Sequence, residues 1–342
     1  MVPRQPAAAG GRRLLAVLAG AALGLLSACS INPPLHLAGI LPGRPVVLLP
    51  SVPFYPQQDY QCGPAALAGV LAASGVAATP AALAPQVYLP GREGSLQLEL
   101  VAATRRAGRI AYRVPGEPAE VFAQLQAGRP VLVFQNVQTR SFPVWHYAVL
   151  VGYDTRANEV YLNSGGQRQM AMGAPGFLRT WDWAGRWALV ALRPGELPAL
   201  PQLEPYIDAV AAYETQAGAT AAAPAWRAAR RQWPRDARPY LALGNTAYAS
   251  GNLPVAIDYY RRGLRLHPGN PALANNLASV LGELGCPGAA IALLEPAQAQ
   301  LAANSQWRPV IAATLAELPA ARPEGEFCAA LYPGDTTSGL SE

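Results

Sequence analysis

The chain of 342 residues contains no lysine, only three histidines and four cysteines, and charged residues make up 14% of it. Every basic side chain is therefore an arginine, and apart from short pairs such as Arg230 and Arg231 the arginines are scattered. The net charge of +5 thus does not predict a nucleic-acid surface. Histidines, cysteines and carboxylates do not cluster as zinc requires, and no phosphate-binding glycine motif occurs. We expect no cofactor, no metal and no nucleic-acid partner.

Residues 1–28 have the pattern of a bacterial export signal and not of a folded domain. Arginines precede an apolar run over residues 14–26, which is too short to cross a bilayer comfortably. The run ends in Leu-Ser-Ala-Cys, which resembles a lipobox with Cys29 as the lipidated residue. That resemblance, with Ser30 after the cysteine, implies a lipid anchor in the outer membrane facing the periplasm. The proline-rich residues 29–50 are then expected to form a tether.

The stretch VPFYPQQDYQCGPAALAGV, residues 52–70, contains the first candidate for chemistry. Cys62 lies where an extended segment ends and a helical pattern begins, and Pro64 suits the first turn of a helix. A helix amino terminus favours a thiolate, which makes Cys62 a candidate nucleophile. Gln57, five residues upstream, is a candidate donor to an oxyanion. His146 opens the strand-like run HYAVLVGYD and is the candidate base.

Helical patterns dominate the chain from Cys62 to about residue 127, and strand patterns follow at 131–137, 146–154, 159–163 and 187–192. Helices followed by an antiparallel sheet predict an α+β domain over residues 51–195. Residues 196–205 are proline-rich and are expected to be a linker.

The Gln-x4-Cys-Gly-Pro segment and the His-Tyr-Ala-Val strand together resemble the bacteriocin-processing peptidases, papain-like cysteine peptidases that cut double-glycine leader peptides. More closely, they resemble stand-alone periplasmic lipoproteins that join such a domain to tetratricopeptide repeats. The resemblance implies a papain-like fold with Cys62 as nucleophile and His146 as general base. It implies Gln57, or its neighbour Gln58, as the oxyanion donor.

The third member of the site departs from the family pattern. The family usually has an Asp that orients the imidazole, whereas this chain reads VYLNSGG at the corresponding strand. A simple offset from His146 places the position on Ser164, with Asn163 beside it. A one-residue slip of a strand reverses which side chain faces the histidine. We name Asn163, because an Asn can hold the ring tautomer in papain-like sites, and Ser164 stays the alternative.

Residues 206–321 repeat with a period of ~34 residues, which indicates about three tetratricopeptide repeats that would bind a protein partner. The remaining residues, 322–342, lack pattern and are expected to be a loose tail. Cys286 and Cys328 are a possible disulfide in an oxidising periplasm.

The leading hypothesis is a lipid-anchored periplasmic cysteine peptidase whose repeats recruit a peptide or protein substrate, or a partner protein. A second is an interaction protein with a catalytically degenerate peptidase fold; the missing Asp favours it, whereas Gln57, Cys62 and His146 oppose it. A third is a cell-wall amidase, although such enzymes commonly carry a second His after the first.

Overall fold

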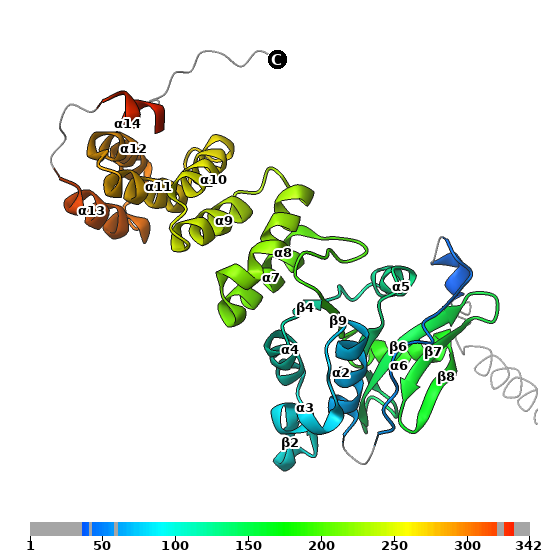
Figure 1. Cartoon of the computed structure of the whole chain (residues 1–342). Coiled ribbons are helices and arrows are strands. Elements are labelled where there is room, and N and C mark those ends of the chain that lie inside the picture. Colours follow the sequence, from blue (N-terminus) through cyan, green and yellow to red (C-terminus); the bar gives the residue numbers. More distant parts are fainter. Residues whose placement is uncertain (1–35, 41–42, 58–60, 320–324, 332–342) are drawn as a thin grey trace, which may run out of the picture.

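The computed structural model describes residues 36–40, 43–57, 61–319 and 325–331. The predicted export signal, the lipobox Cys29 and Gln58 lie outside the described residues. Figure 1 shows a sheet-containing amino-terminal part and a row of helices that extends away from it. Within the described part of the chain, no helix is both long and apolar enough to span a membrane.

An antiparallel sheet forms the centre of the amino-terminal part. Its seven strands lie in the order β4-β9-β5-β6-β7-β8, with β1 paired to one end of β6. The strands are β1 (Val46–Leu48), β4 (Ile110–Arg113), β5 (Val131–Asn136), β6 (Trp145–Asp154), β7 (Glu159–Ser164), β8 (Gln167–Gly173) and β9 (Ala188–Leu192).

Helices cover both faces of this sheet, because β6 alternates buried side chains between them. Tyr147 and Val149 face a core shared with three helices, whereas Ala148 and Leu150 face a second core. The face with Tyr147 is covered by α2 (Cys62–Ala73), α3 (Pro80–Val87) and α4 (Gln97–Arg106). Between α3 and α4 lies a small hairpin of β2 (Tyr88–Leu89) and β3 (Gly94–Ser95), whose two strands are joined by the short helix η2 (Pro90–Arg92). The second face carries α5 (Pro118–Gln126) and α6 (Ala174–Asp182).

The α2 helix is apolar and buried over most of its length because it packs between the sheet and the helices α3 and α4. It begins at Cys62, as the sequence predicts, and Gly75 follows it with φ +89°. At its carboxyl end, Arg109 and Arg193 both donate to the carbonyl oxygen of Ser74, at 2.9 Å each. Two cations at this end complement the helix dipole and hold the helix that carries Cys62.

The segment before α2 is more ordered than the expected tether. Leu37, in the short helix η1 (Leu37–Gly39), is fully buried in the core behind the sheet. β1 adds to β6, and Thr155 N–H donates to Pro45 O. The tether prediction is therefore wrong for the described residues from His36 to position 50, because their apolar side chains and backbone groups find partners on the sheet.

The helical part contains three antiparallel helix pairs and two further helices among the described residues. The pairs are α7 (Leu203–Ala217) with α8 (Ala219–Gln232), α9 (Arg238–Ala249) with α10 (Leu253–Leu266), and α11 (Pro271–Glu283) with α12 (Pro287–Gln300); α13 (Trp307–Glu317) and α14 (Glu326–Leu331) follow. Small residues let the paired helices approach, since a Cβ at Gly244 would overlap the ring of Tyr260. The predicted repeat architecture is confirmed.

The first helix pair packs directly on the sheet-containing part. Tyr206 and Tyr213 of α7 belong to the same buried core as Ile110 of β4. Between the two parts, Gln202 Nε2 donates to Glu120 Oε1 at 2.7 Å, and Ala199 N–H donates to Gln124 Oε1 at 3.3 Å. Residues 196–202 are thus held against the sheet-containing part, so the segment expected to be a linker does not separate the two parts.

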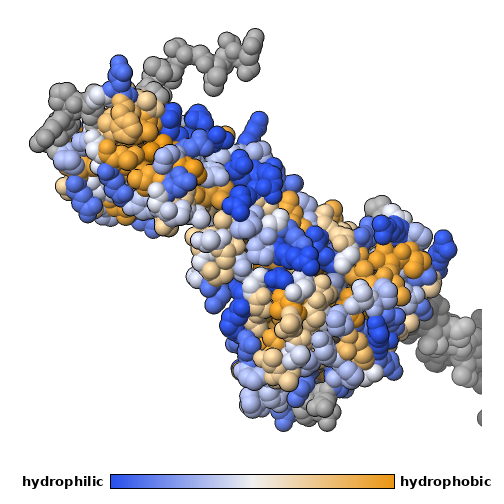
Figure 2. All heavy atoms as spheres, viewed as in Figure 1, coloured by the Kyte–Doolittle hydropathy of each residue, from blue (hydrophilic) through white to orange (hydrophobic). Residues whose placement is uncertain are grey.

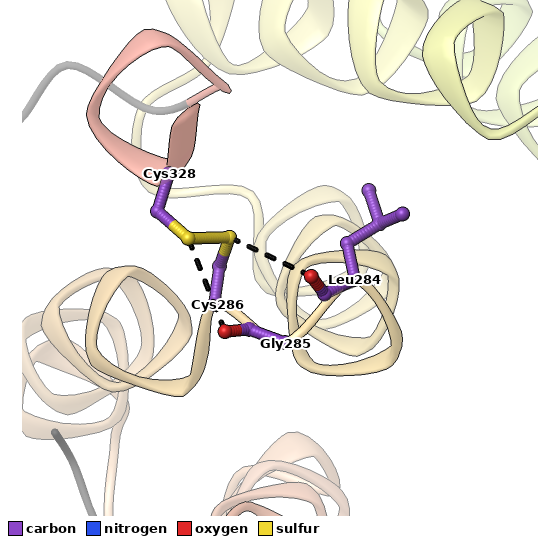
Figure 3. Close-up of a disulfide and its surroundings, with 4 residues drawn as sticks. All are labelled: Leu284, Gly285, Cys286 and Cys328. Carbon is purple, nitrogen blue, oxygen red and sulfur yellow. Dashed lines mark hydrogen bonds between the residues drawn. A yellow bond between two sulfur atoms is a disulfide. The ribbon is translucent and has the colours of Figure 1, made fainter. Parts of the chain in front are cut away.

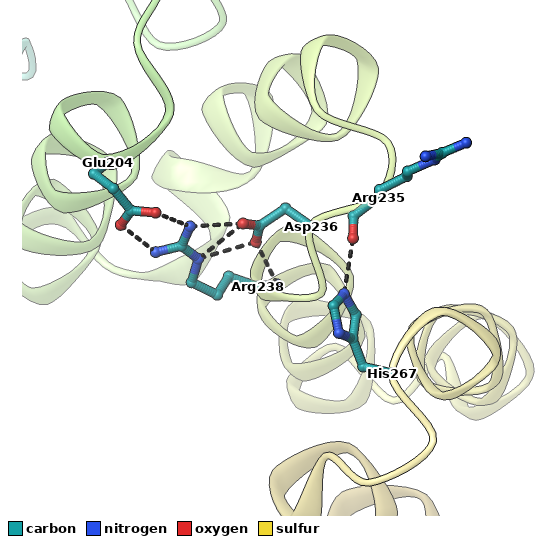
Figure 4. A network of polar contacts seen from close by, with 5 residues as sticks. All are labelled: Glu204, Arg235, Asp236, Arg238 and His267. Atoms are coloured by element: carbon teal, nitrogen blue, oxygen red, sulfur yellow. Dashed lines mark hydrogen bonds and ion pairs between the residues drawn. The ribbon is translucent and has the colours of Figure 1, made fainter.

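A polar network connects successive helix pairs (Figure 4). Arg238, at the start of α9, donates to both carboxylate oxygens of Glu204 in α7, at 2.7 and 2.8 Å, and also binds Asp236. These hydrogen bonds lower the pKa of Glu204 below its ordinary value. His267, after α10, lies 2.8 Å from Arg235 O through its Nε2, so this histidine has a structural role. The contacts link one helix pair to the next.

The end of the helical part is tied back by a disulfide. Cys328 in α14 is bonded to Cys286, which precedes α12. The sulfurs lie close to the carbonyl groups of Leu284 and Gly285, in the turn between α11 and α12 (Figure 3). Residues 325–331 therefore do not belong to a loose tail, contrary to the prediction, while residues 332–342 lie outside the described part. Figure 2 shows hydrophobic residues on the surface near this end.

The disulfide closes a loop of 42 residues, so its loss is expected to destabilise the last helices. We predict that Cys286→Ser with Cys328→Ser lowers the free energy of unfolding by about 2–4 kcal/mol, because the reduced unfolded chain gains conformational entropy. Thermal unfolding followed by circular dichroism measures the change. Dithiothreitol should produce the same shift in the wild-type protein and none in the double variant; equal melting temperatures would contradict the prediction.

Candidate active site

The backbone of β6 holds the candidate nucleophile. β7 pairs with β6 only over residues 149–154 of β6, which leaves the edge at Tyr147 open. Tyr147 N–H points at the Cys62 sulfur, as do the N–H groups of Cys62 and Gly63 at the start of α2. Consecutive backbone donors at a helix amino terminus are suited to hold negative charge.

Gln57 is held at the same edge by three hydrogen bonds. Its side-chain Nε2 donates to Tyr147 O at 3.3 Å, and its Oε1 accepts from Gly165 N–H at 3.0 Å. Its own N–H donates to Gly165 O, also at 3.0 Å. Gly165 lies in the turn between β7 and β8 with φ +57°, a conformation that favours glycine. The contacts orient the amide, and one of its two Nε2 hydrogens is left for a further acceptor.

His146 and Ser164 lie on the same face of the sheet, and His146 Nε2 is 2.9 Å from Ser164 Oγ. Asn163 points to the other face, where its Oδ1 accepts from Gln169 N–H at 3.0 Å. The contact with the imidazole thus belongs to Ser164, and the choice of Asn163 is corrected. Strand alternation decides the matter, since neighbouring residues of β7 face opposite sides.

Burial controls the protonation of both candidate groups. Desolvation raises the pKa of the Cys62 thiol, and the backbone N–H donors from Tyr147, Gly63 and Cys62 offset only part of the rise. Desolvation also lowers the pKa of His146. Near neutral pH both groups are therefore uncharged in the free protein. Burial therefore opposes the thiolate that the helix terminus would favour at Cys62.

These side chains line one large cavity, with a volume of about 1030 Å³. Gln57, Cys62 and His146, three of the four predicted site residues, are among the residues that line it. The sequence did not reveal the opposite wall, which comes from the β2–β3 hairpin and the start of α4. Ser95 of that hairpin packs so closely on α2 that a Cβ at Gly63 would overlap its hydroxyl, which explains the glycine after the cysteine.

No group of three or more His, Cys, Asp or Glu side chains that could bind a metal occurs among the residues the structure covers. The lining groups suited to nucleophilic chemistry include a thiol, an imidazole and amide donors. That set matches nucleophilic acyl transfer.

Two family models match the chain. Residues 50–186 match the Peptidase_C39 like family, and residues 237–280 match the tetratricopeptide repeat. The amino-terminal part has a C39-like peptidase fold. A C39-like domain suggests a cysteine peptidase, and the repeats suggest protein–protein interaction.

Solved structures with similar parts have low identity. A crystal structure of a proposed C39-like peptidase from Bacillus anthracis is 20% identical with a TM-score of 0.36, covering 43% of this chain and 98% of its own. The type III secretion translocator chaperone SycD from Yersinia enterocolitica, also solved with a peptide of the translocator YopD, is 21% identical with a TM-score of 0.32. It covers 34% of this chain and 90–91% of its own. No curated protein matches the chain in sequence.

The raised thiol pKa can be measured directly. We predict that the rate of Cys62 alkylation by iodoacetamide rises with pH to a midpoint above the ordinary value for cysteine, because burial disfavours the thiolate. Mass spectrometry of the Cys62 peptide follows the reaction, with glutathione as the reference thiol and Cys62→Ser as the blank. A midpoint below that of glutathione would instead indicate a preformed thiolate–imidazolium pair.

The assignment of Ser164 predicts a difference between two neighbouring substitutions. Ser164→Asp places a carboxylate beside His146 Nε2 and is expected to raise the histidine pKa by about 1–3 units. Asn163→Asp is the matched control, since its side chain faces Gln169, and it should leave the histidine nearly unchanged. NMR titration of His146 measures both. A larger shift of the His146 pKa in the Asn163 variant would show that Asn163, and not Ser164, is the residue beside the imidazole.

Proposed function

We propose that the protein is a cysteine peptidase that hydrolyses peptide bonds through Cys62 and His146. The observation that carries this proposal is that the thiol, the imidazole and the Gln57 amide converge on one cavity, with the sulfur facing backbone donors at the start of α2. The match to the Peptidase_C39 like family supports it.

The proposed reaction starts from the neutral pair. Ser164 Oγ contacts His146 Nε2, which leaves Nδ1 to accept the thiol proton as the Cys62 sulfur attacks the substrate carbonyl carbon. The second Nε2 hydrogen of Gln57 and the backbone N–H of Cys62 stabilise the oxyanion. The tetrahedral intermediate collapses as His146 returns the proton to the leaving amine. His146 then deprotonates a water molecule, which hydrolyses the thioester and releases the acid and the thiol.

We further propose that Cys29 is lipidated and anchors the protein in the outer membrane, facing the periplasm. Seven residues separate Cys29 from the docked Leu37, and the eight Cα–Cα steps between them span at most about 29 Å. The peptidase domain would thus act close to the membrane surface. The row of helix pairs, which is docked on the sheet through α7, would recruit the substrate or a partner protein.

The experiment is a digestion assay on the purified full chain. A mixed peptide library is incubated with the wild type, Cys62→Ala and His146→Ala, and mass spectrometry records the products and the acyl-enzyme on Cys62. We expect cleavage by the wild type, none by Cys62→Ala, and a loss of about 10²–10⁴-fold in kcat/KM for His146→Ala, the usual contribution of a general base.

Two outcomes would replace the proposal. Release of fragments from peptidoglycan without peptide cleavage would indicate the amidase. An unreactive Cys62 with neither activity would indicate a degenerate fold in which the repeats carry the function. His146 contacts a hydroxyl where the family usually has a carboxylate. The degenerate fold is therefore the stronger of the two alternatives.

A further inference from the structure

The cavity beside Cys62 is much larger than two glycine residues of a substrate would need. Its volume of about 1030 Å³ is at the upper end of ordinary ligand pockets. A site that accepts only a double glycine gains nothing from such space, because glycine has no side chain to bury there. The size of the cavity therefore bears on which residues of a substrate lie next to the scissile bond.

The apolar walls of the cavity come from two segments of the chain, the start of α4 and the start of β6. On one wall, Leu98 and Leu96 have 77% and 39% of their surfaces exposed. On the other, Trp145 and Val144 are 51% and 46% exposed. The loop that leads into this wall, residues 137–144, also carries Phe142, which is 74% exposed. Large apolar side chains gathered around one cavity mark a binding surface.

The aromatic wall is rigid. Trp145 stacks on Phe134, with ring centroids 5.2 Å apart and planes at 16°, and Phe134 contacts Tyr147 at 4.6 Å. Tyr147 in turn meets the buried Trp187 edge-on at 5.9 Å. The exposed ring is thus fixed through a continuous aromatic series into the core, and a ligand that packs on it does not have to order it first.

The charged side chains at the cavity balance each other. Arg92 and Glu93, adjacent residues at the end of η2, both line it, so the wall has no excess of one sign. An acidic or basic segment would gain little from this pair. Apolar contact is the main recognition that the walls offer.

We propose that the cavity binds a bulky aliphatic or aromatic side chain of the substrate protein, carried by a residue that flanks the scissile bond. The occupant is a substrate peptide, because the apolar walls and the groups Gln57, Cys62 and His146 line one continuous cavity. The inference rests on the proposed peptidase function. It distinguishes this site from one that accepts only a double glycine next to the scissile bond.

The test uses internally quenched peptides that share one scaffold and differ only in the residues flanking the scissile bond: Phe, Leu, Gly-Gly, Asp or Arg. For the full chain we expect kcat/KM for the Phe and Leu peptides to exceed that for Gly-Gly by on the order of 10- to 100-fold, which corresponds to burial of one large side chain. Mass spectrometry of the products shows on which side of the cleaved bond the preference lies.

Two variants locate the preference. Leu98→Ala, at a highly exposed position of α4, and Trp145→Ala should each bring the Phe to Gly-Gly ratio towards one. Val310→Ala in α13 is the control, since Val310 is also an exposed apolar residue, at 42%, but lies far along the helical part, and its ratio should equal that of the wild type. Circular dichroism verifies that each variant is folded.

A binding measurement separates the two proposals. Fluorescence anisotropy with the same peptides and Cys62→Ala protein reports recognition without cleavage. Preferred binding of the Phe peptide by a protein that cleaves nothing would support the cavity inference and refute the peptidase. Cleavage with equal or better rates for Gly-Gly would refute the inference and support the peptidase. A dimer that Leu98→Ala dissociates would show that a second copy covers the walls, and would also overturn the inference.

Discussion

The open edge of β6 at Tyr147 is the constraint on which the candidate site depends. Because β7 stops pairing before this residue, its N–H and C=O remain available, and they hold the Cys62 sulfur and the Gln57 amide. An antiparallel strand directs both groups of one residue to the same side, so a single unpaired position can hold two site residues. The side chain of His146, the preceding residue, lies on the opposite face of the sheet from that of Tyr147, because side chains alternate along the strand.

The second determinant is the burial of the site. Burial raises the pKa of the Cys62 thiol and lowers the pKa of the His146 imidazole. Both shifts favour the uncharged form of the group. A hydroxyl at Ser164 orients the ring without adding charge, whereas a carboxylate would favour the imidazolium. Burial and the Ser164 contact therefore act in the same direction, because both favour the uncharged forms of the thiol and the imidazole.

The helical part is built as an extension of the peptidase domain. Tyr206 and Tyr213 in α7 share the core of β4, and the residues between β9 and α7 are tied down by Glu120 and Gln124. Such packing limits independent rotation at the junction, because apolar surface would have to be exposed. A protein held by the repeats would consequently keep a defined orientation towards the cavity. At the far end of the helical part, the disulfide restrains α14 in a similar way.

The sequence by itself determined the features that depend on local pattern. Gly63 and Pro64 mark the start of α2 at Cys62, the run after His146 forms β6, and a period of ~34 residues predicts the helix pairs. Only the tertiary structure decided between Ser164 and Asn163, because adjacent strand residues face opposite sides and the sequence does not set the register. It likewise decided the raised thiol pKa, the docked junction before α7 and the ordered α14, since each arises from contacts between segments distant in the chain.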